Sequence, residues 1–213
     1  MIHPEGILWP GTAFYDAISR SAIFQRNYEL VAEDIVSYCP EGSLLDIGTG
    51  PGRLLIVLHR KSPRLRLVGV DSSGSMVTKA RRNLVRAGLS HAIDIEVGNA
   101  SFLPFHGESF DVVVSTGSIH HWKEPEKGLN EVYRVLRRKG VALMYDLVSD
   151  TPQYVLEEVA RDFGKLESVL LRIHALEEPF YTSKDFELLA RGTLFKRGYT
   201  KFVGVQCCLV LRK

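Results

Sequence analysis

The strongest constraint on the fold is a regular alternation of short apolar runs with amphipathic stretches between residues 43 and 146. Residues 44–47 form an apolar run, a glycine-rich turn follows, and residues 53–60 carry apolar side chains at helical spacing before Pro63. The same pattern predicts further strands at 65–70, 93–97, 110–115 and 141–147, and further helices at 75–87 and 125–136. We expect Gly88 to close the first of these helices and Lys139-Gly140 to end the second. Strands joined by such helices make right-handed crossovers, so the sequence predicts a doubly wound α/β fold with a mostly parallel sheet.

Two segments flank this body. Residues 12–38 and 152–173 have helical patterns, the latter as one helix or as two joined near Gly164. A capping pattern at residues 182–185 opens another helix through Ala190. Residues 199–211 read as two strands turned at Gly204, which predicts a C-terminal hairpin that adds an antiparallel strand to the sheet.

Composition restricts the class of protein. The 213 residues are 45% hydrophobic and 24% charged, which is typical of a globular protein of one domain. The 27 Lys and Arg residues nearly balance the 25 Asp and Glu residues, so no overall charge favours nucleic acid or membrane as a partner. The sequence has no apolar run of membrane-spanning length and no secretory signal. Its three cysteines form no disulfide framework, so we expect reduced thiols in a cytoplasmic protein.

A glycine-rich motif carries the chemistry. Residues 46–52 read Asp-Ile-Gly-Thr-Gly-Pro-Gly, directly after the first strand and before the first helix. Glycines there allow a tight turn and let a ligand lie against the backbone. Asp71, at the tip of the second strand, is an acidic residue in the position that accepts ribose hydroxyls. The sequence therefore predicts a nucleoside-containing ligand at the carboxyl edge of the sheet.

Two common nucleotide motifs do not fit. A dinucleotide fingerprint needs a sixth-position glycine, where this chain has Arg53, and a phosphate loop needs Gly-Lys-Ser/Thr, where it has Gly52-Arg53-Leu54. The order Asp-x-Gly-x-Gly-x-Gly instead resembles the first motif of the class I S-adenosylmethionine-dependent methyltransferases. Residues 68–76, 98–105, 109–114, 120–122 and 131–140 resemble the later motifs of the small-molecule type in the right order.

The resemblance covers residues 15–146 and implies a Rossmann-like seven-stranded sheet with S-adenosyl-L-methionine as cofactor. It implies that Asp46 orients the methionine amino group, that Asp71 holds the ribose, and that Asn99 addresses the adenine edge. Where many relatives carry Asp, Asn99 keeps an acceptor oxygen but loses the charge. The full cofactor-binding set that it implies is Asp46, Gly48, Thr49, Gly50, Gly52, Asp71, Ser72, Met76, Asn99, Ala100, Ser115 and Thr116.

His120 and His121 are the candidate catalytic residues, because they follow the fourth strand where an acceptor would approach the methyl group. A structural role is the alternative, since methyl transfer depends mainly on alignment. Trp122 fits packing better than a wall for the sulfonium, a role that Phe14 or Tyr15 would fill. Met76 suits either the core or an adenine contact, and no histidine or cysteine spacing resembles a metal site.

We therefore expect one methyltransferase domain over residues 1–213, with a helical cap at 1–40, a cofactor-binding core at 41–148, and acceptor-lid helices and terminal strands at 149–213. The expected reaction transfers a methyl group to a small or medium-sized acceptor by in-line displacement. An RNA or protein acceptor is an alternative, and so is a protein that binds the cofactor without turnover. Against RNA, Ser115-Thr116-Gly117-Ser118 stands where amino-methylating families carry Asn/Asp-Pro-Pro-Tyr/Phe. The acceptor and the oligomeric state stay open.

Overall fold

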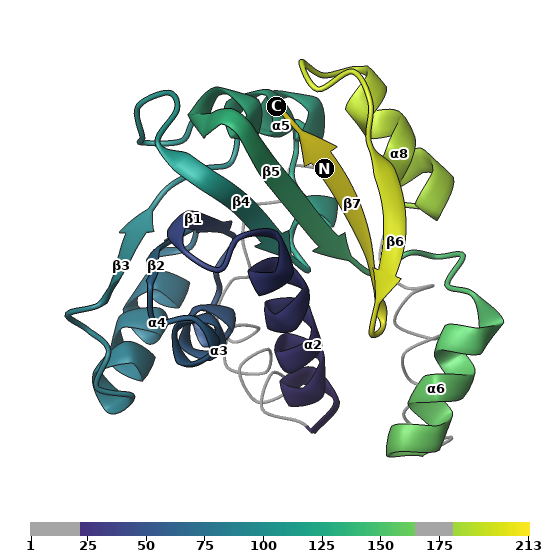
Figure 1. The fold of residues 1–213 in the computed structure, drawn as a ribbon, viewed down its shortest axis with the longest axis horizontal. Coiled ribbons are helices and arrows are strands. Elements are labelled where there is room, and N and C mark those ends of the chain that lie inside the picture. The colour runs from purple at the N-terminus through teal and green to yellow at the C-terminus, as the bar shows by residue number, and fades with distance from the viewer. Residues whose placement is uncertain (1–21, 165–180) are drawn as a thin grey trace.

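A computed structural model describes residues 22–164 and 181–213, and these residues build one seven-stranded sheet (Figure 1). The strands are β1 Gly42–Ile47, β2 Leu65–Asp71, β3 Ile93–Val97, β4 Phe110–Thr116, β5 Leu136–Asp146, β6 Tyr199–Val203 and β7 Gln206–Arg212. They lie in the order β3-β2-β1-β4-β5-β7-β6. Strands β1 to β5 pair in parallel, whereas β7 runs antiparallel to both β5 and β6. The doubly wound α/β prediction and the C-terminal hairpin are both confirmed.

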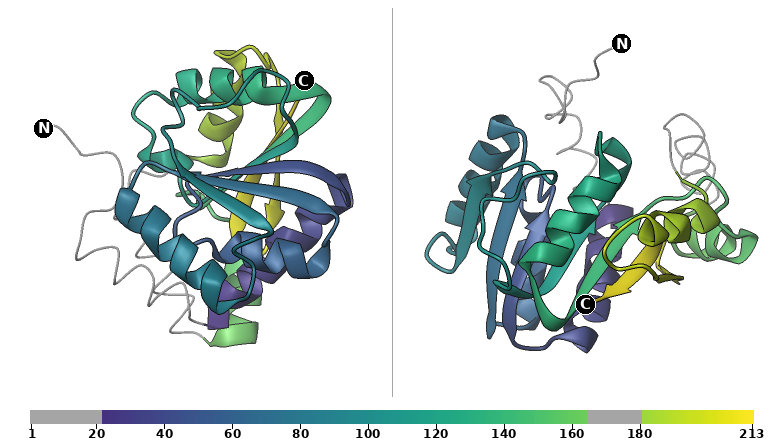
Figure 2. Two further views of the ribbon diagram at one scale, coloured as in Figure 1. Left: turned by 90° about the vertical axis from the view of Figure 1, so that its left-hand side faces the viewer. Right: turned by 90° about the horizontal axis from the view of Figure 1, so that it is seen from above.

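Helices cover both faces of this sheet (Figure 2). They are α2 Ala22–Tyr38, α3 Arg53–Lys61, α4 Gly74–Arg86, α5 Pro125–Val135, α6 Gln153–Phe163 and α8 Ser183–Arg191, with a short 3-10 turn η1 at Ile119–His121. Apolar residues of α2, α3 and α4 share one core cluster with Leu44, and those of α5 and α8 share a second with Leu45. Because successive strand residues face opposite sides, neighbouring leucines of β1 serve both cores.

Local signals placed most of the helix ends correctly. Gly88 has a φ of 72° just beyond the end of α4, as the sequence predicts. Thr182 caps α8, because its hydroxyl accepts a hydrogen bond from the backbone N–H of Asp185 at 3.1 Å. The hairpin turns at Gly204, whose φ is 55°. Glycine and a capping hydroxyl thus mark these ends because their chemistry acts within a few residues.

The boundary between α5 and β5 differs from the prediction. Lys139-Gly140 does not end the helix, which stops at Val135, and β5 begins at Leu136 instead of Val141. Leu136 is fully buried and pairs with Phe110 of β4, so tertiary pairing starts the strand five residues before the predicted position. Lys139, with a φ of 67°, then lies inside the strand, where its N–H donates to the carbonyl of Lys213 at 3.2 Å.

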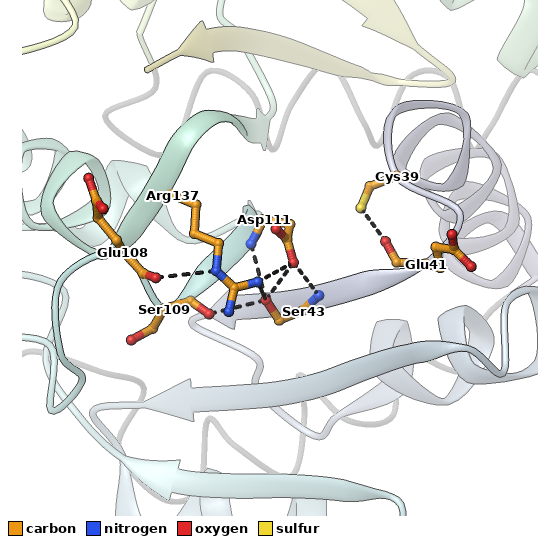
Figure 3. Close-up of polar contacts among 7 residues, drawn as sticks. All are labelled: Cys39, Glu41, Ser43, Glu108, Ser109, Asp111 and Arg137. Atoms are coloured by element: carbon orange, nitrogen blue, oxygen red, sulfur yellow. Dashed lines mark hydrogen bonds and ion pairs between the residues drawn. The ribbon is translucent and has the colours of Figure 1, made fainter.

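Arg137 ties the amino ends of three strands together (Figure 3). Its guanidinium donates to Asp111 Oδ2 of β4 at 2.7 Å and to Ser43 Oγ of β1 at 3.1 Å. Burial raises the pKa of Asp111, but the hydrogen bonds from Ser43 and Arg137 outweigh burial and lower this pKa below its ordinary value. The cluster lies at the edge of the sheet opposite to the glycine-rich turn, so its role is structural.

Parts of several predictions lie outside the described residues. The segment 12–21 of the predicted first helix is among them, and so are Phe14 and Tyr15. The predicted helix at 152–173 is described as far as Phe163, where Gly164 caps α6. Within residues 22–164 and 181–213, no helix is long and apolar enough to cross a membrane.

Candidate functional site

The carboxyl ends of β1, β2 and β4 open into a cleft. Of the predicted cofactor-binding residues, those that line it are Gly48, Gly50, Asp71, Ser72, Met76, Asn99 and Ala100. His121 also lines it, together with residues that the sequence analysis did not assign to the cofactor, among them Ser101, Ser118, Trp122 and Lys123. The cleft lies where ligands bind in open α/β sheets, outside the carboxyl ends of the strands.

Glycine is required at the turn after β1. Gly48 has a φ of 72°, and a Cβ added there would lie 2.1 Å from Ser118 Oγ. Its N–H donates to the carbonyl of Val70 at 2.8 Å, which holds the turn against β2. Gly50, with a φ of 52°, donates its N–H to Asp71 Oδ2 at 2.8 Å. The floor of the cleft is therefore bare backbone that is fixed to the tip of the second strand.

Asp71 lines the cleft, and both of its carboxylate oxygens accept hydrogen bonds from the backbone. Oδ2 accepts from Gly50, and Oδ1 accepts from the N–H of Ser73 at 2.9 Å. Burial raises the pKa of Asp71, and these two hydrogen bonds oppose that rise. Each oxygen keeps a second lone pair that can accept a hydroxyl. Asp71 does not cap α4, because the N-cap residue is Ser73.

Asp46 lies below the turn and is almost completely buried. Its Oδ2 accepts from the Thr49 hydroxyl at 2.8 Å, and its Oδ1 has no hydrogen-bond partner among the described residues. Burial raises the pKa of Asp46 to about 7. The hydroxyls of Ser115 and Thr116 on the adjacent strand β4 are likewise buried without a partner in the described part of the chain. A buried acceptor of this kind calls for a donor from a ligand or from water.

Several predicted residues shape the cleft without lining it. Thr49 is engaged with Asp46, and its N–H donates to Val70. Gly52 has a φ of 74° and is the N-cap residue of α3, and a Cβ added there would lie 3.3 Å from Ala80 Cβ of α4. Gly52 therefore permits close helix packing. Ser115 and Thr116 also lie outside the lining, as Asp46 does.

The loop after β3 forms one wall of the cleft through Asn99, Ala100 and Ser101. Asn99 Oδ1 accepts from the N–H of Ser101 at 2.7 Å, and the Asn99 carbonyl accepts from Phe102 at 3.0 Å. The acceptor oxygen of Asn99 thus closes its own loop, a function that an amide performs as well as a carboxylate would. Met76 is 3% exposed, so it belongs to the core, and it also lines the cleft, where its contact with adenine stays a prediction.

The two histidines have different surroundings. His120 Nδ1 lies 2.8 Å from Asp146 Oδ2 and 3.0 Å from Oδ1, and its side chain is 7% exposed. The rings of His121 and His120 lie 3.8 Å apart between centroids and are tilted by 49° to each other, and His121 lines the cleft. Trp122 also lines the cleft, and it packs so closely on Gly128 that a Cβ there would lie 2.5 Å from its ring. Sequence reasoning missed Asp146, although an acidic residue at the end of the fifth strand is a readable signal.

Comparison with known proteins agrees with this geometry. A family model described as a methyltransferase domain matches residues 45–144. The chain is 28% identical over 145 residues to the ubiquinone/menaquinone biosynthesis C-methyltransferase UbiE of Geotalea daltonii, an alignment that covers 67% of this chain and 61% of that protein. It is 32% identical over 137 residues to the demethylmenaquinone methyltransferase of Thermotoga maritima, which covers 63% of this chain and 57% of that protein. The chain thus spans about three fifths of the length of these relatives.

A solved structure has a similar fold. It is that of a Methanococcus maripaludis protein described as an S-adenosyl-L-methionine-dependent methyltransferase, with a TM-score of 0.75 and 21% sequence identity. The match covers 100% of this chain and 97% of that one. The seven-stranded Rossmann-like sheet is therefore an architecture that the two proteins share.

Proposed function

Because the chain belongs to the class I S-adenosylmethionine-dependent methyltransferases, we propose that its cleft binds S-adenosyl-L-methionine and that it transfers the methyl group to a small-molecule acceptor. The observation that carries the proposal is the link between Gly50 and Asp71, which joins a bare backbone floor to a carboxylate at the tip of β2. This arrangement suits a nucleoside with an amino-acid tail that lies along the backbone.

The residues present fit this cofactor. The free lone pairs of Asp71 suit the two ribose hydroxyls, and the unpartnered Oδ1 of Asp46 suits the ammonium group of the methionine part, directly or through water. Glycine is needed at position 48 because a side chain there would collide with Ser118, which also lines the cleft. Asn99 and Ala100 form the wall on the adenine side.

When bound, S-adenosyl-L-methionine supplies a methyl group that its sulfonium has already activated. The protein then has to hold the cofactor, exclude water and align the acceptor for in-line attack, and proximity supplies most of the acceleration. The glycine-rich turn after β1 and the tip of β2 hold the cofactor. We assign the acceptor side to the 3-10 turn η1 and to the segments at 1–40 and 149–213, within one domain over residues 1–213.

His120 and His121 are the proposed catalytic pair. Because the carboxylate of Asp146 lies 2.8 Å from His120 Nδ1, we assign the ring proton to Nδ1 and the basic role to Nε2. His121 lines the cleft, and its ring lies 3.8 Å from that of His120 between centroids, so a histidine is placed where it can take up a proton that the acceptor loses on methylation. His120→Ala and His121→Ala, measured separately, test this role. Full turnover in both variants would show that the two histidines have only a structural role.

The relatives direct the choice of acceptor. Two of them are named for ubiquinone, menaquinone or demethylmenaquinone chemistry, so a ring-hydroxylated quinol is the first acceptor to test. The assay follows transfer of a labelled methyl group from S-adenosyl-L-methionine to a demethylated quinol, with Asp71→Ala as the control that removes the ribose ligand. Labelled product with the wild-type protein alone supports the proposal. Cofactor binding without labelling of the quinol or of any small-molecule pool would favour a protein that binds the cofactor without turnover.

A further inference from the structure

Two charged residues of α5, Glu131 and Arg134, form hydrogen bonds with the backbone of the loop that forms the wall on the adenine side. Glu131 Oε2 accepts the backbone N–H of Leu103 at 2.9 Å. Arg134 donates to the carbonyls of Leu103 at 3.0 Å and of Phe105 at 2.7 Å. The two side chains also bind each other, with Arg134 Nε and Nη2 each 2.7 Å from a Glu131 oxygen. One helix thus satisfies three backbone groups of one loop.

The pair is chemically suited to hold a loop in one conformation. The Arg134 hydrogen bond lowers the pKa of Glu131, and the Leu103 N–H adds to this effect against burial. The planar guanidinium presents donors in a fixed fork, so it can reach two carbonyls and a carboxylate at once. Glu131 is 17% exposed at its side chain, which protects these bonds from competing water better than a fully exposed pair.

These hydrogen bonds lie directly beside the cleft wall. Asn99, Ala100 and Ser101 line the cleft, and Leu103 follows two residues later with its side chain buried in the core. Next to it, Phe102 is 80% exposed, so its side chain gives the loop little anchorage. Ala100 and Phe105 also pack against the core, and the α5 pair supplies the hydrogen bonds that fix the backbone of Leu103 and Phe105.

We infer that Glu131 and Arg134 are positioning residues that make the cofactor site selective for an adenine base, an inference that rests on the proposed function. Adenine differs from a 6-oxo purine in presenting an exocyclic amine, which is a donor, where the other base presents an acceptor. A wall held in one conformation rejects the wrong pattern because it leaves polar groups unpaired. A loop released from α5 can rearrange around either base, so selectivity falls.

The experiment compares two ligands that differ at this one position, S-adenosylhomocysteine and S-inosylhomocysteine. Calorimetry gives the dissociation constant of each ligand for the wild-type protein, Glu131→Gln and Arg134→Lys. The selectivity ratio is the dissociation constant of S-inosylhomocysteine divided by that of S-adenosylhomocysteine. Arg134→Lys keeps the charge but loses the fork, and Glu131→Gln loses the charge. We expect the ratio to fall by about tenfold in both variants, the effect of one lost hydrogen bond of ordinary strength.

Lys127→Ala is the matched control. Lys127 lies on the same helix and forms an exposed pair with Glu124 at 3.1 Å, so its loss removes none of the loop's hydrogen bonds and only the smallest of the charge effects on Glu131. We expect an unchanged ratio there. If the wild-type protein binds S-adenosylhomocysteine but the ratio is unchanged in Glu131→Gln and Arg134→Lys, the inference is wrong and the proposed function still stands. A wild-type protein that binds neither ligand would overturn the proposed function and the inference with it.

A second measurement needs no variant and is independent of folding defects. The amide of Leu103 should exchange with solvent deuterium much more slowly than an unprotected amide, because its N–H is bonded to Glu131. Exchange of Leu103 at the unprotected rate would contradict a fixed wall.

Discussion

The pH dependence of cofactor binding follows from the burial of Asp46. Its pKa of about 7 means that the carboxylate is about half ionised at pH 7 and roughly one tenth ionised at about pH 6. If the ammonium group of the ligand requires the ionised form, the apparent dissociation constant scales inversely with that fraction. Binding should then be about fivefold weaker at pH 6 than at pH 7, whereas an ordinary Asp would give no change in this range.

Calorimetric titration with S-adenosylhomocysteine between about pH 6 and about pH 7 measures this, below the range in which the ligand's own amino group titrates. Asp46→Asn should bind with the same affinity at both pH values, and more weakly than the wild-type protein at pH 7. Thr49→Val removes the hydroxyl that favours the charged form of Asp46, so the midpoint should move to higher pH. A wild-type affinity that does not change between these pH values would refute the role of Asp46.

The same shift has an opposite consequence for the protein without ligand. The folded pKa of Asp46 lies above its unfolded value, so the folded state binds more protons between the two, and the contribution of this group to stability falls as pH rises toward 7. Asp46→Asn should therefore raise the melting temperature of the free protein above about pH 7. A lower melting temperature there would show that the carboxylate stabilises the fold.

Three further changes have defined outcomes. Asp71→Ala should weaken cofactor binding by about 1.5–3 kcal/mol in calorimetry, the range for hydrogen bonds to a charged group, and an unchanged affinity would remove its ribose role. Gly48→Ala should lower the free energy of unfolding more than Gly88→Ala, because both have a φ of 72° but only the first meets a side chain, at 2.1 Å. Equal losses in denaturant titrations would argue against that contact. Asp146→Asn should lower kcat by about a hundredfold through the tautomer of His120 without changing cofactor affinity, and a normal kcat would limit the pair to structure.

Most of the fold was predictable because its signals are local. Apolar periodicity located the strands and the helices between them, and glycines marked the turns at Gly88 and Gly204. The start of β5 was not predictable in this way, because Leu136 becomes extended by pairing with Phe110, which lies far away in the sequence. Lys139 compounds the error, since a non-glycine residue in the left-handed region inside a strand has no sequence signature.

In the candidate site too, features with local sequence signals were predictable, whereas contacts between distant residues were not. The motif located the turn and Asp71, because both follow directly from the end of a strand. Sequence alone did not distinguish the settings of His120 and His121, since the contact with Asp146, 26 residues later, decides which ring faces the cleft. The hydrogen bond between Glu131 and Leu103 likewise joins distant segments, so the spacing of apolar residues in α5 did not predict it.

The most direct test of the central claim is calorimetric titration of the purified protein with S-adenosyl-L-methionine, S-adenosylhomocysteine and NAD in parallel. The geometry of Gly48, Gly50 and Asp71 predicts micromolar binding of the first two ligands and none of NAD. Binding of NAD, or of none of the three, would contradict the assignment of this cleft to S-adenosyl-L-methionine.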